Sequence, residues 1–170
     1  QRVSPLVATM IATCLNDRDI YIRRRVVYIL ADMISRETGV RQAEEPARLT
    51  VINYLHNLEE GSIYGLLELA VMDPQVEKSL AQLLNACPTA GRYLANILSD
   101  WKNPLPIRQQ AAYYIGLVGY MEVLPVLERL LDRLQSRQSS QFSMSFASSP
   151  ARSDEDILPY LRTAIKQMTA

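Results

Sequence analysis

The residue types that most often carry out catalysis are sparse in this chain and far apart in its sequence. The single histidine, His56, has no cysteine and no second histidine at the spacing that a metal cluster needs. Cys14 and Cys87 lie among apolar residues in helical patterns, and neither has a neighbouring histidine that could activate its thiolate. We interpret both as reduced core thiols. The sequence therefore predicts no catalytic residue, no metal ligand and no cofactor.

Groups of carboxylates occur, but their positions suggest helix punctuation and not acid–base chemistry. They lie at 44–45, at 59–60 and at 154–156, each at a predicted helix start or turn. Negative charge at these places favours the helix dipole. The six glycines form no phosphate-cradling loop, and we interpret them as turns or close helix contacts.

Composition places the chain among globular proteins without a strong net charge. It has 170 residues, 48% of them hydrophobic, and 18 Lys and Arg balance 18 Asp and Glu. This balance gives no general attraction for nucleic acid or for a membrane, so we expect no membrane partner, and a nucleic-acid partner would need a local patch. No signal-peptide pattern and no run of about 18 apolar residues occurs, which predicts a cytoplasmic protein. Since Gln1 directly precedes a helical pattern, we expect a fragment of a longer chain with other domains.

The stretch 104–134 predicts two amphipathic helices joined by a short turn. In each helix, apolar side chains recur at spacings of three and four. Gly119 ends the first helix where a positive φ is needed, and Pro125 lies near the start of the second, where its missing N–H does little harm. The stripes are Ile107, Ala111, Ala112, Ile115 and Val118, then Val123, Leu124, Leu127, Leu130, Leu131 and Leu134. Such a hairpin has more apolar surface than it can bury alone, so it needs neighbours of the same kind.

This hairpin resembles a HEAT repeat of the bacterial HEAT-like type. The matching residues are Ile107-Arg108, Ala111-Ala112, Ile115, 117–119, Leu124-Pro125-Val126-Leu127 and Leu130-Leu131-Asp132. The resemblance is clearest over 104–134 and weaker over 19–36 and 46–100, where Glu77 follows Val76 in place of the expected arginine. It implies an all-α fold, a right-handed α-solenoid of antiparallel hairpins that binds other macromolecules.

Further amphipathic helices are predicted along the chain. Ser4 and Pro5 begin one that ends near residue 16, with Leu6, Val7, Met10, Ile11, Cys14 and Leu15 as its stripe. Others cover 19–36, 46–58, 62–72, 76–84 and 88–100. Among their apolar residues, Ile29 lies in the stripe of 19–36, Leu49 faces inward from 46–58, and Val71 lies in the stripe of 62–72. Aligning the first helices of successive repeats at Val26, Leu49, Ser79 and Ala111 gives offsets of 23, 30 and 32. The first offset is too short for a complete pair. Either the unit near residue 36 lacks its second helix, or the 46–58 helix plays that part.

We expect three parts in the chain. Residues 1–136 form the repeat stack, 137–153 form a flexible Ser-rich loop, and 154–170 form a helix that packs on the stack or begins another repeat. Pro159 lies within the first turns of this helix and can shift its start. In the loop, Phe142, Met144 and Phe146 alternate, so either they dock as an extended segment or the loop is unanchored.

The densest basic run, 23–25, is interpreted as structural. Three consecutive helical residues fan over about 200°, so they cannot form one contact patch. We expect solvated arginines with one ion pair within the repeat, and not a phosphate site.

These features favour a non-catalytic scaffold that binds a partner protein or peptide. In HEAT-like stacks the second helices line the concave face, and their polar i, i+4 pairs would project there together. The candidate binding residues are Tyr64, Glu68, Arg92, Asn96, Glu128, Arg129, Asp132 and Arg133.

Two alternatives remain open, since alkylpurine DNA glycosylases and bilin lyases resemble this fold. The first is a nucleic-acid-binding or base-acting HEAT module, for which Trp101, several tyrosines and Arg108 are available. The second is a bilin-lyase-like protein. Neither family's active-site pattern can be placed on this sequence.

Overall fold

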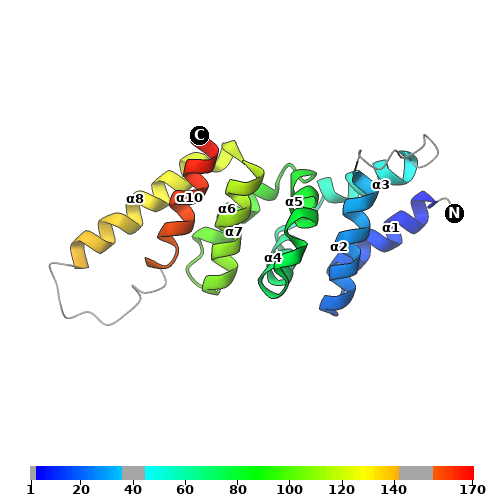
Figure 1. The fold of residues 1–170 in the computed structure, drawn as a ribbon, viewed down its shortest axis with the longest axis horizontal. Helices are drawn as coiled ribbons and strands as arrows, with labels where there is room; N and C mark the ends of the chain where they lie inside the picture. The colour runs from blue at the N-terminus through cyan, green and yellow to red at the C-terminus, as the bar shows by residue number, and fades with distance from the viewer. Residues whose placement is uncertain (1–2, 36–44, 142–154) are drawn as a thin grey trace. The chain divides into compact units, whose positions relative to one another are not determined.

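The computed structural model describes residues 3–35, 45–141 and 155–170, and within these ranges the chain is all-helical, without strands (Figure 1). The chain forms two compact units, Gln1–Ala90 and Gly91–Ala170. No helix in the described ranges combines the length and the apolar character that a membrane crossing requires. The all-α prediction is confirmed.

The helices of the first unit are α1 (Pro5–Thr13), α2 (Ile20–Ile34), α3 (Glu45–His56), α4 (Glu60–Met72) and α5 (Glu77–Asn85), with short 3₁₀ turns at η1 (Cys14–Asn16) and η3 (Pro74–Val76). Those of the second unit are α6 (Ala90–Ser99), which begins at the boundary, α7 (Leu105–Val118), α8 (Leu124–Gln141) and α10 (Leu158–Thr169), with η4 (Met121–Val123) between α7 and α8.

Helix ends form where the sequence provides capping residues. The Ser4 hydroxyl accepts a hydrogen bond from the Val7 N–H at 3.3 Å, and Pro5 occupies the first turn of α1. Asp19 caps α2 in the same way through the Tyr21 N–H at 2.8 Å. Gly119 ends α7 in the left-handed region, with φ of 83°. These predicted ends are confirmed.

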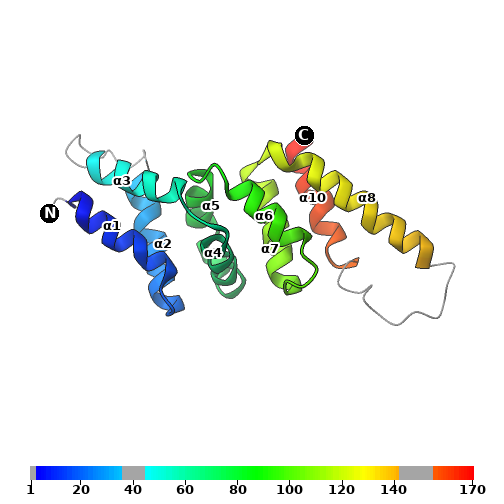
Figure 2. The same ribbon diagram turned by 180° about the vertical axis from the view of Figure 1, so that it is seen from behind.

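In the first unit, α1 packs against α3, and α2 packs against both α3 and α5. α1, α2 and α3 lie side by side in both views (Figures 1 and 2). Leu30, Val51, Leu55 and Leu80 are fully buried in the core of this unit. Because α3 packs on α2, the structure favours the alternative in which the 46–58 helix is the partner of the 19–36 helix.

Some residues assigned to the apolar stripes point away from the core. Leu49 is 53% exposed, Ile29 is 45% exposed and Val71 is 39% exposed, so their predicted inward placement is wrong. On α1, Ala8 and Ala12 face the core, whereas Leu6 and Met10 are exposed, and so is Val7. These helices are apolar on more than one side, and only one side has a neighbour among the described elements.

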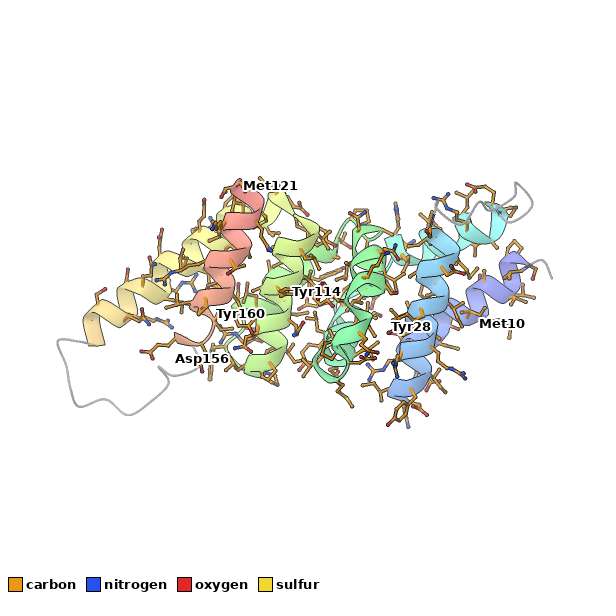
Figure 3. All side chains as sticks on the ribbon, in the orientation of Figure 1. Met10, Tyr28, Tyr114, Met121, Asp156 and Tyr160 are labelled. Atoms are coloured by element: carbon orange, nitrogen blue, oxygen red, sulfur yellow. The ribbon has the colours of Figure 1, made fainter. Side chains whose placement is uncertain are left out.

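The second unit is organised around α7. Half of the residues of this helix are buried, and Tyr114 is only 2% exposed (Figure 3). α10 packs on α7 and also on α8. At Gly116 the two backbones approach so closely that a Cβ there would lie 2.7 Å from the Cα of Ala164. The Gln109 side chain also donates to the Asp156 carbonyl at 3.3 Å, which holds the segment before α10 to α7.

Two predicted boundaries near the C-terminus need correction. α8 continues to Gln141, so the loop predicted over 137–153 is helical at its beginning, and the rest of it, 142–153, lies outside the described residues. The hydroxyls of Ser136 and Ser139 each donate at 2.8 Å to a carbonyl four residues earlier, so these polar groups have partners within the helix. α10 begins at Leu158 and not at 154, with Pro159 in its first turn.

We expect Gly116→Ala to lower the free energy of unfolding by about 1–3 kcal/mol, because the added methyl group forces α7 and α10 apart. Urea denaturation measures this. The matched control is Gly61→Ala in α4, where a Cβ meets nothing within 4 Å and stability is unchanged or raised by up to about 1 kcal/mol. Equal midpoints for the two variants would contradict the close approach of α7 and α10.

Candidate functional site

The predicted binding residues divide between the two units. Tyr64 and Glu68 lie on α4 in the first unit, where Tyr64 is half-buried and Glu68 is exposed. The other six lie in the second unit and are all exposed: Arg92 and Asn96 on α6, and Glu128, Arg129, Asp132 and Arg133 on α8. α4 and α6 each carry one i, i+4 pair of these residues, whereas α8 carries two such pairs side by side. We define these four as the α8 charged strip.

The α8 charged strip consists of two like-charged rows. Glu128 and Asp132 are four residues apart, and so are Arg129 and Arg133, so each pair lies on the same line of the helix surface. None of these four side chains forms an ion pair with another described residue. Like charges at this spacing disfavour an isolated helix by about 0.2–0.5 kcal/mol per pair. Arg129 and Asp132 are neighbours of opposite charge, three residues apart, so the strip has no net charge, and its four side chains are exposed and not held in ion pairs with other described residues.

Two members of the arginine run on α2 act inside the first unit. Arg23 donates from Nη1 to the Gly65 carbonyl of α4 at 2.9 Å. Arg24 lies 2.6 Å from the carboxylate of Asp73, and Arg25 is exposed. The run therefore forms one ion pair, but with a residue beyond α4 and not within the repeat as expected. Arg23 is half-buried and bonded where we expected it to be solvated.

Arg108, which the nucleic-acid alternative needs on the surface, lies in the core. It is 2% exposed, and its Nε donates to the Leu98 carbonyl at the end of α6 at 2.9 Å. It cannot contact a phosphate backbone from this position. Trp101 is 75% exposed, so an aromatic group is available to a partner, but the arginine is not.

A small polar network joins three elements of the first unit. Asn16 at the end of η1 donates to the Tyr54 hydroxyl of α3 at 3.4 Å and accepts from the Ser62 hydroxyl of α4 at 2.8 Å. Burial raises the pKa of Tyr54, the nearby Cys14 raises it further, and the Asn16 hydrogen bond opposes both. The Cys14 thiol donates to the Met10 carbonyl at 3.3 Å, so it is engaged within its own helix. These contacts hold helices together and place no nucleophile beside a base.

A cavity that the sequence did not indicate lies between α7 and α10. It has a volume of about 250 Å³ and is lined by Tyr113, Pro159, Tyr160, Thr163, Ala164 and Gln167. No charged side chain lines it. Ligand pockets usually measure about 300–1,000 Å³, so this cavity suits a single neutral side chain better than a cofactor. Its residues come from distant parts of the chain, and none of them belongs to a recognisable motif.

A second cavity of about 480 Å³ lies in the first unit between the ends of α2 and α5. Polar side chains of Arg48, Gln82 and Asn85 line it together with Ser35. Arg48 is already bound, since its Nη1 lies 3.0 Å from Glu45 and its Nε donates to the Ile34 carbonyl at 3.4 Å. Ser35 borders segment 36–44, which lies outside the described residues, so we assign no ligand to this cavity.

In the part of the chain that the structure describes, no group of three or more His, Cys, Asp and Glu residues could hold a metal ion. His56 is exposed at the end of α3. Cys87 is buried beside Thr89, with 3.5 Å between sulfur and hydroxyl oxygen.

No protein-family model, no curated protein and no solved structure matches this chain. The fold class therefore rests on the helices described above. The HEAT resemblance stays a prediction from the sequence.

The raised pKa of Tyr54 gives a pH-dependent prediction. Because the phenol ionises at higher pH in the folded chain than at its ordinary value of about 10, its contribution to stability is complete below that pH. The contribution is lost as the pH rises through the folded-state pKa. We expect the urea midpoint to fall as the pH rises above about 10, and to fall less in Tyr54→Phe. Tyr21→Phe, at a 72% exposed position, is the control and should follow the wild type.

Proposed function

We propose that this chain is a cytoplasmic HEAT-like α-solenoid module that binds a partner protein or peptide through the second helices of its repeats. The observation that carries the proposal is the α8 charged strip. The module has no catalytic role of its own.

Helix packing within each unit supports the solenoid part of the proposal. α2 and α5 both correspond to predicted first helices, and they pack against each other. α7 is also a predicted first helix, and it packs against α10, which begins another repeat in this interpretation. First helices packed on first helices are what a stack of hairpins requires. The left-handed Gly119 between α7 and α8 is the expected hairpin turn.

The α8 charged strip supports a protein partner. An acidic row beside a basic row attracts a surface that carries both charges in the opposite order. Towards a uniform polyanion, the repulsion by the acidic row offsets the attraction by the basic row. Charges arranged in this way set orientation and association rate. A partner with complementary rows would also relieve the like-charge repulsion along α8.

The cavity between α7 and α10 supports the same class of partner. Two tyrosines, a proline and neutral polar groups surround a space sized for one side chain. Tyrosine is enriched at protein interfaces because its ring is apolar and its hydroxyl forms hydrogen bonds. The charged strip can select a partner, and a neutral anchor residue in the cavity can add affinity.

The test is affinity capture on the immobilised chain from nuclease-treated lysate. We expect proteins that are retained at low salt and lost in both Glu128→Lys/Asp132→Lys and Arg129→Glu/Arg133→Glu, with binding weakened at least about tenfold. The matched control is Arg162→Glu/Lys166→Glu, which reverses two exposed charges on α10 and should retain the proteins. A parallel capture uses lysate without nuclease. If it recovers nucleic acid and no protein, the proposal is overturned in favour of the nucleic-acid module.

A further inference from the structure

α2 has an exposed face that the first unit does not use. Its exposed residues recur at spacings of three, four and seven, and they fall within an arc of about 120° of the helix. They are Tyr21, Ile22, Arg25, Tyr28, Ile29 and Asp32. We define these six residues as the α2 outer face. Four of them are large and apolar or aromatic, which is unusual for a solvated helix surface.

The opposite side of α2 is fully engaged. Val27 and Leu30 are completely buried, and α3 and α5 pack there. Arg23 and Arg24 bind Gly65 and Asp73 respectively. The outer face is therefore separate from the contacts that hold the unit together, and changes on it leave those contacts intact.

The ring of Tyr28 is held in place at the middle of this face (Figure 3). The guanidinium carbon of Arg24 lies 5.9 Å from the centroid of this ring, while the same arginine is bound to Asp73. An aromatic side chain that is already oriented loses less conformational entropy when a partner covers it.

Arg25 and Asp32 give the outer face a direction. They are seven residues apart, so they lie on the same line of the helix, about 10 Å from each other along its axis. That separation is too long for the two to pair within one chain. Neither forms an ion pair with another described residue.

The charges on one copy of α2 are complementary to those on a second copy that runs in the opposite direction. In an antiparallel pair with its two-fold axis midway between Tyr28 and Ile29, Arg25 of each copy lies level with Asp32 of the other. The two-fold axis keeps each residue on its own flank of the interface, so Tyr28 of one copy faces Tyr28 of the other, and Ile29 faces Ile29. Both ion pairs form in this one register, with the tyrosines on one flank and the isoleucines on the other, and no like charges meet.

We propose that the α2 outer face binds a second copy of this chain, through antiparallel pairing of the two α2 helices. The contact is isologous, because the same residues serve on both copies. One helix face is at the small end of specific interfaces, so the dimer is weak, with a dissociation constant of about 10–100 µM.

The exposed side of α1 is a different kind of surface. Leu6 and Met10 are 71% and 62% exposed, but Pro5–Thr13 contains no charged residue that could fix a register or an orientation. It serves here as the control for unspecific apolar association.

Sedimentation equilibrium of the 170-residue chain, from about 5 µM to 1 mM, tests the proposal. We expect reversible dimerisation of the wild type. Arg25→Asp and Asp32→Arg should each weaken it at least about tenfold, because each places like charges level with each other. An equimolar mixture of the two variants should dimerise again, since both ion pairs reform in the mixed pair. The double variant, Arg25→Asp/Asp32→Arg, should dimerise alone.

Met10→Glu on α1 should leave dimerisation unchanged, and circular dichroism confirms that every variant is folded. A wild type that stays monomeric up to 1 mM overturns the proposal. Dimerisation that survives either single charge reversal, or that is not restored in the mixture, also overturns it, as does its loss in Met10→Glu. All of these outcomes are independent of the α8 charged strip, so they do not decide the proposed partner binding.

Discussion

The second unit depends on α7 being packed closely on two sides. On one side, Gly116 leaves no room for a side chain against Ala164 of α10. On another, the buried guanidinium of Arg108 donates to the Leu98 carbonyl of α6. The last carbonyls of a helix lack partners within it and carry partial negative charge, so they are a suitable environment for a buried cation. Asn103 adds a second bond of this kind, to the Ile97 carbonyl at 2.9 Å.

The first unit contains a related contact. Arg23 on α2 donates to the Gly65 carbonyl of α4, where the absence of a side chain lets the guanidinium approach the backbone. Both arginines follow an isoleucine, as Ile22-Arg23 and Ile107-Arg108, the pair on which the family resemblance partly rests. In both units this arginine ties its helix to the backbone of a neighbouring one. These two arginines are therefore structural, and charge available to a partner comes from other residues.

Much of the fold could be predicted because capping and helical periodicity are local properties. Ser4, Asp19 and Gly119 mark helix ends in the sequence and in the structure alike. Leu49 and Ile29 were misplaced because periodicity identifies apolar sides without showing which of them has a neighbour. The end of α8 was misjudged because Ser-rich composition was taken to end the helix, whereas the serine hydroxyls find partners in the preceding turn and the helix continues to Gln141.

The candidate site was predictable only in part, because local periodicity does not show which distant segments pack together. The α8 charged strip was accessible from the sequence, since polar residues at i, i+4 on an amphipathic helix face away from its core. The cavity between α7 and α10 was not, because Tyr113 and Tyr160 meet only after α10 packs on α7. Gly116 permits that packing, and nothing local in the sequence distinguishes it from a glycine in a turn.

Three helices present three different surfaces, and their chemistry separates what each can do. α1 exposes apolar side chains without charge, which can provide affinity but no orientation. α8 exposes charge with little apolar surface, which can provide orientation and association rate but little affinity in water. The α2 outer face combines both, and its charges are complementary under a two-fold rotation. A surface of this mixed kind can distinguish a second copy from an unrelated partner, because a wrong partner leaves Arg25 or Asp32 desolvated without an opposite charge.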